Sequence, residues 1–384
     1  MLKLSRKQDC SGCTACASVC PKHCIEMRPD SEGFLYPVVD ENTCINCGLC
    51  NNICPVLNQS EPRQPLHCYA AKNKNKDVLL KSSSGGVFSL LAQYIIAEKN
   101  GAVFGAMWEN ERVVHGFIES TDELYKLRGS KYVQSDLKDS FHKVSMFLKA
   151  GRHVLFSGTP CEIAGLKSYL RKDYENLLTV DLACHGTPSP KVLSMYIKEL
   201  KDKYGVDSLF LNFRDKSTGW STYSVTATSG DKILFSEIAT ENIYMKGYLH
   251  ELFSRPSCHD CAFKYFRSGS DITLADFWGV EKVLPDYKSE EGISLILENT
   301  EKGADTIKIV MDGHEIKGVN YEDAIRDNGA LLHSEQPHPQ RRRFFRNIKF
   351  ACKVSTLIDD NMQLTRLTRM KLLFSLLYNK CFTK

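Results

Sequence analysis

The sequence "CSGCTACASVCP" at residues 10–21 contains four cysteines in the spacing C-x2-C-x2-C-x3-C, followed by proline. The same spacing returns in "CINCGLCNNICP" at residues 44–55. Thiolates are soft ligands that suit iron–sulfur clusters or zinc. Because the two copies share one spacing, we expect one kind of metal site to explain both.

The order of the cysteines in each copy favours clusters over zinc. A structural zinc site usually takes its four ligands as two separated pairs, and this remains the alternative. Three cysteines within seven residues suit a four-iron cluster, and the fourth cysteine, before proline, serves the other cluster of a pair. The spacing therefore predicts two [4Fe–4S] clusters, one on Cys10, Cys13, Cys16 and Cys54 and the other on Cys44, Cys47, Cys50 and Cys20. Residues 1–57 thus resemble the bacterial two-cluster ferredoxin module.

Nine of the sixteen cysteines lie in residues 10–54 of this 384-residue chain. The start "MLKLSRKQDC" has no apolar stretch typical of a secretory signal, and no run of 18 apolar residues predicts a transmembrane helix. In a reducing compartment such cysteines more often bind metal than form disulfides. We therefore expect a cytoplasmic protein. The ninth cysteine, Cys24, is interpreted as a small buried hydrophobic residue, because eight ligands complete two clusters.

The net charge of +4 comes from one end of the chain. Residues 341–384 carry eleven basic and two acidic side chains, so the remaining 340 residues carry a net charge near −5. This distribution argues against a nucleic-acid-binding face on the body. The tail is basic and amphipathic, and we favour a helix packed on the body over the alternative, peripheral contact with a membrane surface.

Between residues 69 and 319, apolar runs alternate with amphipathic stretches, which predicts a mixed α/β (α+β) body with a partly parallel sheet. We expect helices over 84–101, 135–151, 160–170 and 189–205, and three short strands within 207–236. The predicted domains are a two-cluster ferredoxin domain (1–57), a linker (58–67), two regions of the α/β body (68–150 and 151–335) and a basic helical tail (336–384).

Four further cysteines come from loops in three parts of this body. Cys161 starts a helix after one predicted strand, Cys184 follows another strand, and Cys258 and Cys261 form a CxxC pair. Such strand ends can converge in an α/β fold. Ordinary buried thiols, a zinc pair or a redox dithiol are the alternatives. A nucleophilic Cys161 with His185 as base would leave the CxxC pair and both N-terminal clusters without a purpose.

Two Gly/Ser loops, "KSSSGG" at residues 81–86 and "RGSKY" at residues 128–132, lie at predicted helix edges. Backbone N–H groups at such edges can hold a phosphate, although capping and turn formation explain either loop alone. No G-x-G-x-x-G follows a strand and no Walker A sequence occurs. The sequence therefore favours neither an NAD Rossmann site nor a P-loop NTPase.

Taken together, several stretches resemble the coenzyme F420 hydrogenase/dehydrogenase beta subunit family, which includes 7-hydroxymethyl chlorophyll a reductase. The matching stretches occur in the family's order after the ferredoxin module: "SSSGGVFSLLAQYI", "GSKYVQS", "SGTPCEIAGL", "DLACHG" and "CHDCAFKYFRSGSDITLADFWG". The resemblance weakens after about residue 300.

The resemblance implies an FAD-dependent iron–sulfur oxidoreductase with a flavin-binding α/β body. It implies a third [4Fe–4S] cluster on Cys161, Cys184, Cys258 and Cys261. The flavin contacts that it implies are Ser84, Gly85, Gly86, Ser130, Lys131, Tyr132, Gly158 and Thr159. Asp276, Trp278 and Gly279 of the "DFWG" stretch are expected near the cofactor.

In the function that this implies, electrons pass from a ferredoxin or another redox protein through the clusters to FAD and on to a small-molecule substrate that the sequence does not identify. The alternatives are an electron-transfer subunit serving a partner enzyme, possibly one of polysaccharide biosynthesis, and a redox-sensing regulatory protein. His185 and Lys131 are conceivable proton donors, but both have structural alternatives, so no catalytic residue is assigned.

Overall fold

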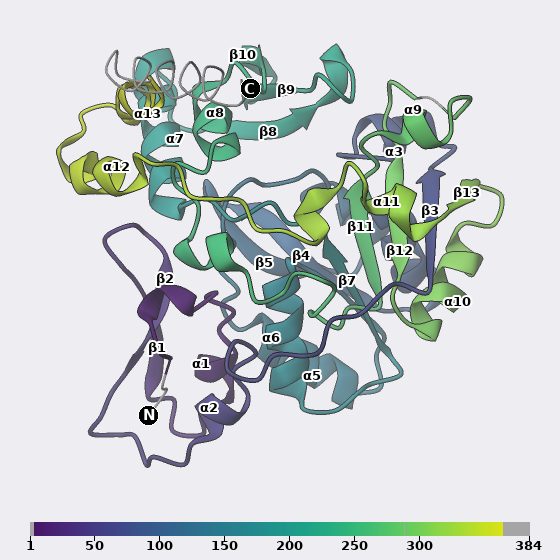
Figure 1. Ribbon diagram of the computed structural model, residues 1–384, viewed down its shortest axis with the longest axis horizontal. Coiled ribbons are helices and arrows are strands. Elements are labelled where there is room, and N and C mark those ends of the chain that lie inside the picture. Colours follow the sequence, from purple (N-terminus) through teal and green to yellow (C-terminus); the bar gives the residue numbers. More distant parts are fainter. Residues whose placement is uncertain (1–3, 288, 364–384) are drawn as a thin grey trace, which may run out of the picture.

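The computed structural model describes residues 4–287 and 289–363 (Figure 1). A large twisted sheet with helices on its faces forms the body of the molecule. The cysteine-rich N-terminal module packs beside it, and a small sheet with the last helices lies above the module. The expected mixed α/β architecture with an N-terminal ferredoxin-like domain is confirmed.

The N-terminal module contains one antiparallel hairpin and two short helices. Strands β1 (Ile25–Pro29) and β2 (Leu35–Val39) pair from Ile25 opposite Val39 to Pro29 opposite Leu35. Helices α1 (Ala15–Val19) and α2 (Leu49–Asn52) each begin inside one of the cysteine repeats. In each repeat the first three cysteines line one pocket.

Eight strands form the large sheet, and those at its centre are parallel. Strands β4, β6, β7 and β11 pair in parallel with their neighbours, whereas the outer pairs are antiparallel. In spatial order the strands are β13 (Glu315–Val319), β3 (His67–Lys72), β12 (Ser294–Glu298), β11 (Ile272–Asp276), β7 (Leu177–Leu182), β6 (Val154–Ser157), β4 (Ala102–Glu109) and β5 (Arg112–Ile118).

Helices cover both faces of this sheet. On one face, α4 (Val87–Gln93), a π-helical turn (Tyr94–Glu98) and α10 (Glu301–Val310) pack over the strands. On the other face, α5 (Ser140–Lys149) and α6 (Pro160–Leu170) share a core with the N-terminal module. The short helices around these layers are α3 (Lys76–Leu80), α9 (Val280–Val283) and α11 (Tyr321–Ile325).

Local signals in the sequence explain the helices that follow β6 and β7. Thr159 and Glu162 form a capping box at the start of α6, and Pro160 occupies its first turn. Helix α7 (Pro190–Tyr204) begins in the same way, with the Ser189 side chain as its cap, and ends at Gly205. Both helices lie where the sequence predicts them.

The helix after the first Gly/Ser loop begins later than expected. Its N-cap is Gly86 rather than Ser84. A Cβ atom on Gly85 would lie 2.3 Å from the carbonyl oxygen of Ala71 and 2.6 Å from the backbone nitrogen of Ser294. The loop therefore lies directly against strands β3 and β12, and the helix starts only after the chain leaves the sheet.

A second, three-stranded sheet contains the strands expected within residues 207–236. Its order is β10 (Lys232–Ile238), β9 (Ser224–Ser229) and β8 (Phe210–Asp215). Its core is shared with α7, α8 (Ile243–Leu249), α12 (Arg341–Asn347) and α13 (Val354–Met362). The part of the basic tail up to Gln363 thus includes two helices packed on the body. The amphipathic stretch 364–380 lies outside the described residues, and no described helix is both long and apolar enough to cross a membrane.

The module contacts the body through α6. A Cβ atom on Gly165, in the second turn of α6, would lie 2.8 Å from the Cys13 Cβ and 3.1 Å from its Sγ. Such distances leave no room for a side chain without displacing the neighbour. Gly165 therefore allows the closest approach between the helix and the first cysteine repeat.

We expect Gly165→Ala to lower the free energy of unfolding by about 1 kcal/mol. The added methyl group costs about 2 kcal/mol by overpacking against Cys13, and this exceeds the gain of about 1 kcal/mol from the higher helix propensity of alanine. Urea denaturation of the anaerobically purified protein measures the difference. Ser168→Ala on the same helix is the control, since it raises helix propensity without adding volume. A Gly165→Ala protein as stable as this control would contradict the close contact.

Candidate functional site

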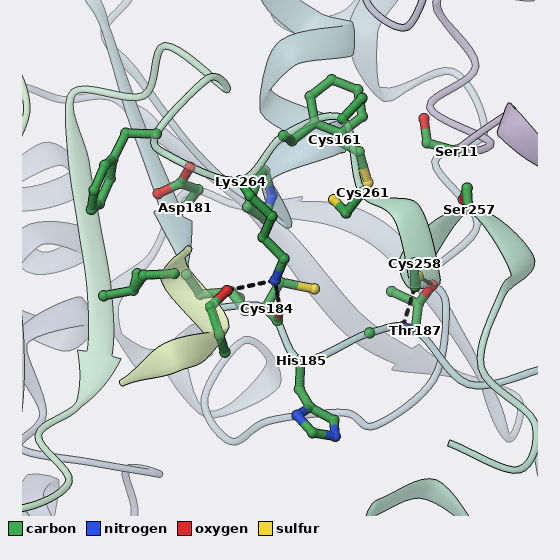
Figure 2. A pocket seen from close by; sticks show the side chains of 18 of the residues that line it. Ser11, Cys161, Asp181, Cys184, His185, Thr187, Ser257, Cys258, Cys261 and Lys264 are labelled. Carbon is green, nitrogen blue, oxygen red and sulfur yellow. Dashed lines mark hydrogen bonds between the residues drawn. The ribbon is translucent and has the colours of Figure 1, made fainter. Parts of the chain in front are cut away.

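Cys161, Cys184, Cys258 and Cys261 line one open pocket of about 720 Å³ (Figure 2). Their side chains reach it from three separate parts of the chain. They surround a hollow, and within residues 4–287 and 289–363 no three His, Cys, Asp or Glu side chains are arranged to hold a single metal ion. The structure thus brings together the four sparse cysteines that the resemblance assigns to a third cluster.

The topology of the sheet explains this convergence. Cys161 lies in the first turn of α6, directly after β6, and Cys184 follows the neighbouring parallel strand β7. The carboxyl ends of parallel strands meet at one edge of a sheet. Cys258 lies in the 3-10 turn Pro256–Asp260 and Cys261 directly after it, facing this edge.

Burial raises the pKa of the Cys161, Cys184 and Cys258 thiols, because the thiolate loses more hydration than the thiol. A nucleophilic cysteine needs a lowered pKa, so burial acts against that alternative for Cys161. A bound metal stabilises buried thiolates. The donor set therefore fits a thiolate-bound iron–sulfur cluster.

Polar groups surround these sulfurs. The Thr159 hydroxyl lies 3.2 Å from the Cys161 Sγ, and the backbone N–H of Thr187 donates to the Cys258 Sγ at 3.4 Å. The Lys264 ammonium donates to the carbonyl oxygen of Cys184 at 2.8 Å, and Figure 2 shows it near the middle of the pocket. Hydrogen bonds and nearby charge of this kind tune iron–sulfur clusters.

The N-terminal cysteines line two further pockets. A pocket of about 320 Å³ is lined by Cys10, Cys13, Cys16 and Cys54, and one of about 390 Å³ by Cys20, Cys44, Cys47 and Cys50. These are the two ligand sets that the spacing predicts. Burial raises the pKa of Cys13 to about 12. We call the pockets, in this order, the first and second cluster sites, and the pocket in Figure 2 the third.

Two residues next to these ligands stand out. Ser11 lines both the first and the third cluster sites. Cys24 is buried, as expected, but it also lines the second site, with its Sγ 3.4 Å from that of Cys20. The structure therefore leaves Cys24 in contact with a predicted ligand.

Comparison with known proteins agrees with this arrangement. Residues 151–324 match the family described as the C-terminal part of the coenzyme F420 hydrogenase/dehydrogenase beta subunit. This region is therefore similar to that beta-subunit family. Residues 9–58 match the 4Fe-4S dicluster domain, so the module is an iron–sulfur cluster-binding domain. The resemblance seen in the sequence is confirmed.

Among curated proteins, the chain is similar to the coenzyme F420-dependent sulfite reductase of Methanocaldococcus jannaschii. The two are 26% identical over 364 residues, which cover 87% of this chain and 50% of that protein. A polyferredoxin-like protein of the same organism is 32% identical over 66 residues, 15% of this chain and 39% of that protein. The chain therefore spans half or less of the length of these relatives.

Among solved structures, the chain is similar to one from the F420-reducing [NiFe] hydrogenase complex of Methanosarcina barkeri. The TM-score is 0.46 at 17% sequence identity, over 76% of this chain and 95% of that chain.

The flavin contacts implied by the beta-subunit resemblance lie in loops at the same sheet edge. Gly85 donates its N–H to Ser294 Oγ, and Ser84 donates its hydroxyl to the Ile293 carbonyl. Ser130 donates its backbone N–H to Ser83 Oγ at 2.8 Å. The two Gly/Ser loops, including Gly86, are thus brought into contact, and their role toward a flavin stays a prediction.

The other predicted contacts already have structural partners. The Lys131 ammonium donates to three carbonyl oxygens of its own loop, and burial lowers its pKa to about 7. Thr159 caps α6, and a Cβ on Gly158 would lie 2.9 Å from a carboxylate oxygen of Glu162. Lys131 is therefore committed to its loop, which argues against it as a free proton donor.

The "DFWG" stretch belongs to a cluster of polar and aromatic side chains. Sequence reasoning named Tyr132, Asp276 and Trp278 of this cluster but not Arg214 or Trp220. The Arg214 guanidinium pairs with Asp276 at 2.8 and 3.0 Å and donates to the Tyr132 hydroxyl at 3.3 Å. Trp278 stacks on Trp220 with ring centroids 4.9 Å apart. The buried Arg214 Nε has no hydrogen-bond partner in the described chain. No sequence signal marked Arg214, because its partners come from distant segments.

His185 points away from the third cluster site (Figure 2). Its Nε2 lies 2.9 Å from the buried Glu251 carboxylate, and His259 Nδ1 lies 3.7 Å from the same carboxylate. Each histidine directly follows a cysteine of the third site. Sequence reasoning missed Glu251, which lies in no recognised motif.

Asp181 is a second buried carboxylate that the sequence did not reveal. It lines the third site and accepts hydrogen bonds from Ser268 and Thr273, both at 2.5 Å. Burial raises its pKa to about 6, although these hydrogen bonds oppose the shift. The folded protein therefore holds this proton more tightly than the unfolded chain does.

A raised carboxyl pKa makes stability fall as pH rises from about 4 to about 6, where the unfolded chain releases the proton first. Between pH 5 and pH 7 we expect the wild type to lose about 1 kcal/mol more stability than Asp181→Asn, whose side chain cannot ionise and still accepts one of the two hydrogen bonds on its amide oxygen. Anaerobic urea denaturation at the two pH values measures this difference. The exposed Asp305→Asn serves as control, and equal pH dependence in all three proteins would contradict the assignment.

Proposed function

We propose that the chain is an iron–sulfur flavoprotein oxidoreductase. Electrons enter at the ferredoxin module, cross the third cluster and leave through a flavin to a small-molecule substrate. The observation that carries the proposal is the convergence of Cys161, Cys184, Cys258 and Cys261 on one pocket beside the first cluster site. A protein that served only as a ferredoxin would not need this second set of thiols.

The surroundings of the two N-terminal cluster sites support a particular order of electron transfer. In the second cluster site Cys47 is exposed, and its neighbour Ile45 is 58% exposed. The first cluster site is buried against α6 and shares Ser11 with the third. A redox protein such as a ferredoxin therefore meets the second site first, and the first site lies between it and the body.

The flavin is proposed to lie at the sheet edge between the Gly/Ser loops and the third cluster site. When bound, a flavin exchanges single electrons on one side and electron pairs on the other. Aromatic rings lead from the second Gly/Ser loop toward the residue after Cys184: Tyr132 lies 5.1 Å from Tyr248, and Tyr248 lies 5.4 Å from His185, ring centroid to centroid. The Ser84 and Ser130 hydroxyls already donate to Ile293 and Ser83, so they can orient the cofactor only as acceptors, and the buried Arg214 Nε is a donor without a partner in the described chain.

For the substrate and the electron donor, the proposal draws on the similar curated protein. That protein is named as a coenzyme F420-dependent sulfite reductase. For the present chain we propose only electron transfer to or from a flavin. The second candidate is an electron-transfer subunit without its own substrate. This candidate is favoured because the match covers only 50% of the length of the curated sulfite reductase.

Iron content tests the three cluster sites. We expect about twelve iron atoms per chain after anaerobic purification, from three four-iron clusters. The double variant Cys184→Ala/Cys258→Ala should retain about eight, because only the third site loses ligands. Cys68→Ala is the control, since Cys68 is buried in β3 and lines none of the three sites. About eight iron atoms in the wild type would refute a third cluster.

Flavin content tests the proposed cofactor separately. We expect about one FAD per chain to be released on denaturation, and a flavin absorption band that dithionite bleaches. Ser130→Trp should lose flavin while keeping its iron, because the larger side chain fills the contact between the two Gly/Ser loops. Full iron without flavin in the wild type would overturn the flavin proposal and favour the electron-transfer subunit.

A further inference from the structure

Arg255 is a fully buried cation at the contact between the module and the body. Its side chain is 1% exposed. The guanidinium donates from Nε to the Cys10 carbonyl at 2.8 Å, from Nη1 to the Gln134 side chain at 2.8 Å, and from Nη2 to the Leu35 carbonyl at 2.9 Å. It also lies over the Tyr36 ring at 4.3 Å. Every contact is to a neutral group.

The described part of the chain offers Arg255 no carboxylate within ion-pairing distance. Other buried guanidinium groups do have one: Arg214 pairs with Asp276 at 2.8 Å, and Arg341 pairs with Glu32 at 2.5 Å. Burying a charge without a counter-charge is costly. An anion is therefore expected beside Arg255 in the working protein.

Arg255 lies between the first and third cluster sites. Its side chain holds the carbonyl of Cys10, a ligand of the first site. Its own carbonyl accepts the N–H of Cys258, a ligand of the third site, at 2.9 Å. Ser11, 6% exposed and with an unpartnered hydroxyl, lines both sites. Thiolate-bound clusters at these two sites would therefore supply the negative charge that Arg255 lacks.

We infer that Arg255 is the buried counter-charge of these two clusters and raises their reduction potentials. A cluster held by four thiolates becomes more negative when it accepts an electron, and a fixed cation nearby stabilises that form. The low dielectric of the buried contact strengthens the effect. Arg255 is thereby a positioning and tuning residue, and the inference rests on the cluster sites proposed above.

The test is a redox titration of the anaerobically purified full chain, followed by electron paramagnetic resonance. For Arg255→Gln we expect at least a tenfold fall in the equilibrium constant for reducing the first or third cluster, which is about 59 mV for a one-electron couple. Arg255→Lys keeps the charge and should recover most of the wild-type potential. A structural role alone would affect both variants alike and leave the potentials unchanged.

A matched control removes a different buried cation, Arg341, from the contact between module and body, together with its ion-pair partner Glu32. The double variant Glu32→Gln/Arg341→Gln loses an ion pair between module and body without changing net charge, and its cluster potentials should stay at the wild-type values. If Arg255→Gln does not fold, Gln134→Glu gives Arg255 a carboxylate at the position of its present 2.8 Å hydrogen bond. This variant should show the same fall.

Two kinds of failure can be separated. Iron and resonance signals that show no clusters at these sites would refute the proposed function. Clusters present at full content, with unshifted potentials in both Arg255→Gln and Gln134→Glu, would overturn the inference about Arg255 and leave the proposed function intact.

Discussion

The arrangement of the sites depends on the contact between α6 and the first cysteine repeat. Helix α6 carries Cys161 in its first turn, and Gly165 meets Cys13 one turn later. At about 1.5 Å per residue, these positions are about 6 Å apart along the helix axis. One rigid element therefore fixes a ligand of the third site against a ligand of the first. No loop movement is needed to bring the two sites together, and a side chain at Gly165 would separate them.

The burial of the thiols makes metal binding part of folding in this chain. Burial raises the pKa of Cys13, Cys161 and Cys184, so without a metal these groups favour the neutral thiol. In the function proposed above, iron would replace the thiol protons of the ligands at each site, and the free energy of that exchange would contribute to the stability of the fold. The same reasoning applies to Arg255, since its charge is unpaired until an anionic group occupies the adjacent sites.

The sequence predicted what depends on local spacing. The cysteine repeats, the capped helices after β6 and β7, and the three short strands could be assigned because a few neighbouring residues determine each of them. Arg255 could not be found in this way, because its partners Cys10 and Leu35 lie 245 and 220 positions away. The Gly/Ser loops remained ambiguous for a different reason. Capping and phosphate binding use the same residue types, and only the folded conformation of the loop shows that the Lys131 ammonium donates to carbonyl oxygens just before it in the chain.

Two cysteine repeats with one spacing become different sites through their surroundings. The second site keeps an exposed ligand, Cys47, whereas the first is enclosed by α6 and lies beside a buried guanidinium. Reduction potentials of iron–sulfur clusters depend on solvent exposure, hydrogen bonds and nearby charge as well as on the ligands. Identical ligand sets therefore need not give identical potentials. Docking of the module on the body creates this asymmetry, because the body contributes both Arg255 and the covering helix. In the proposed function, the direction in which electrons prefer to move would therefore be set at the contact between module and body and not within the module itself.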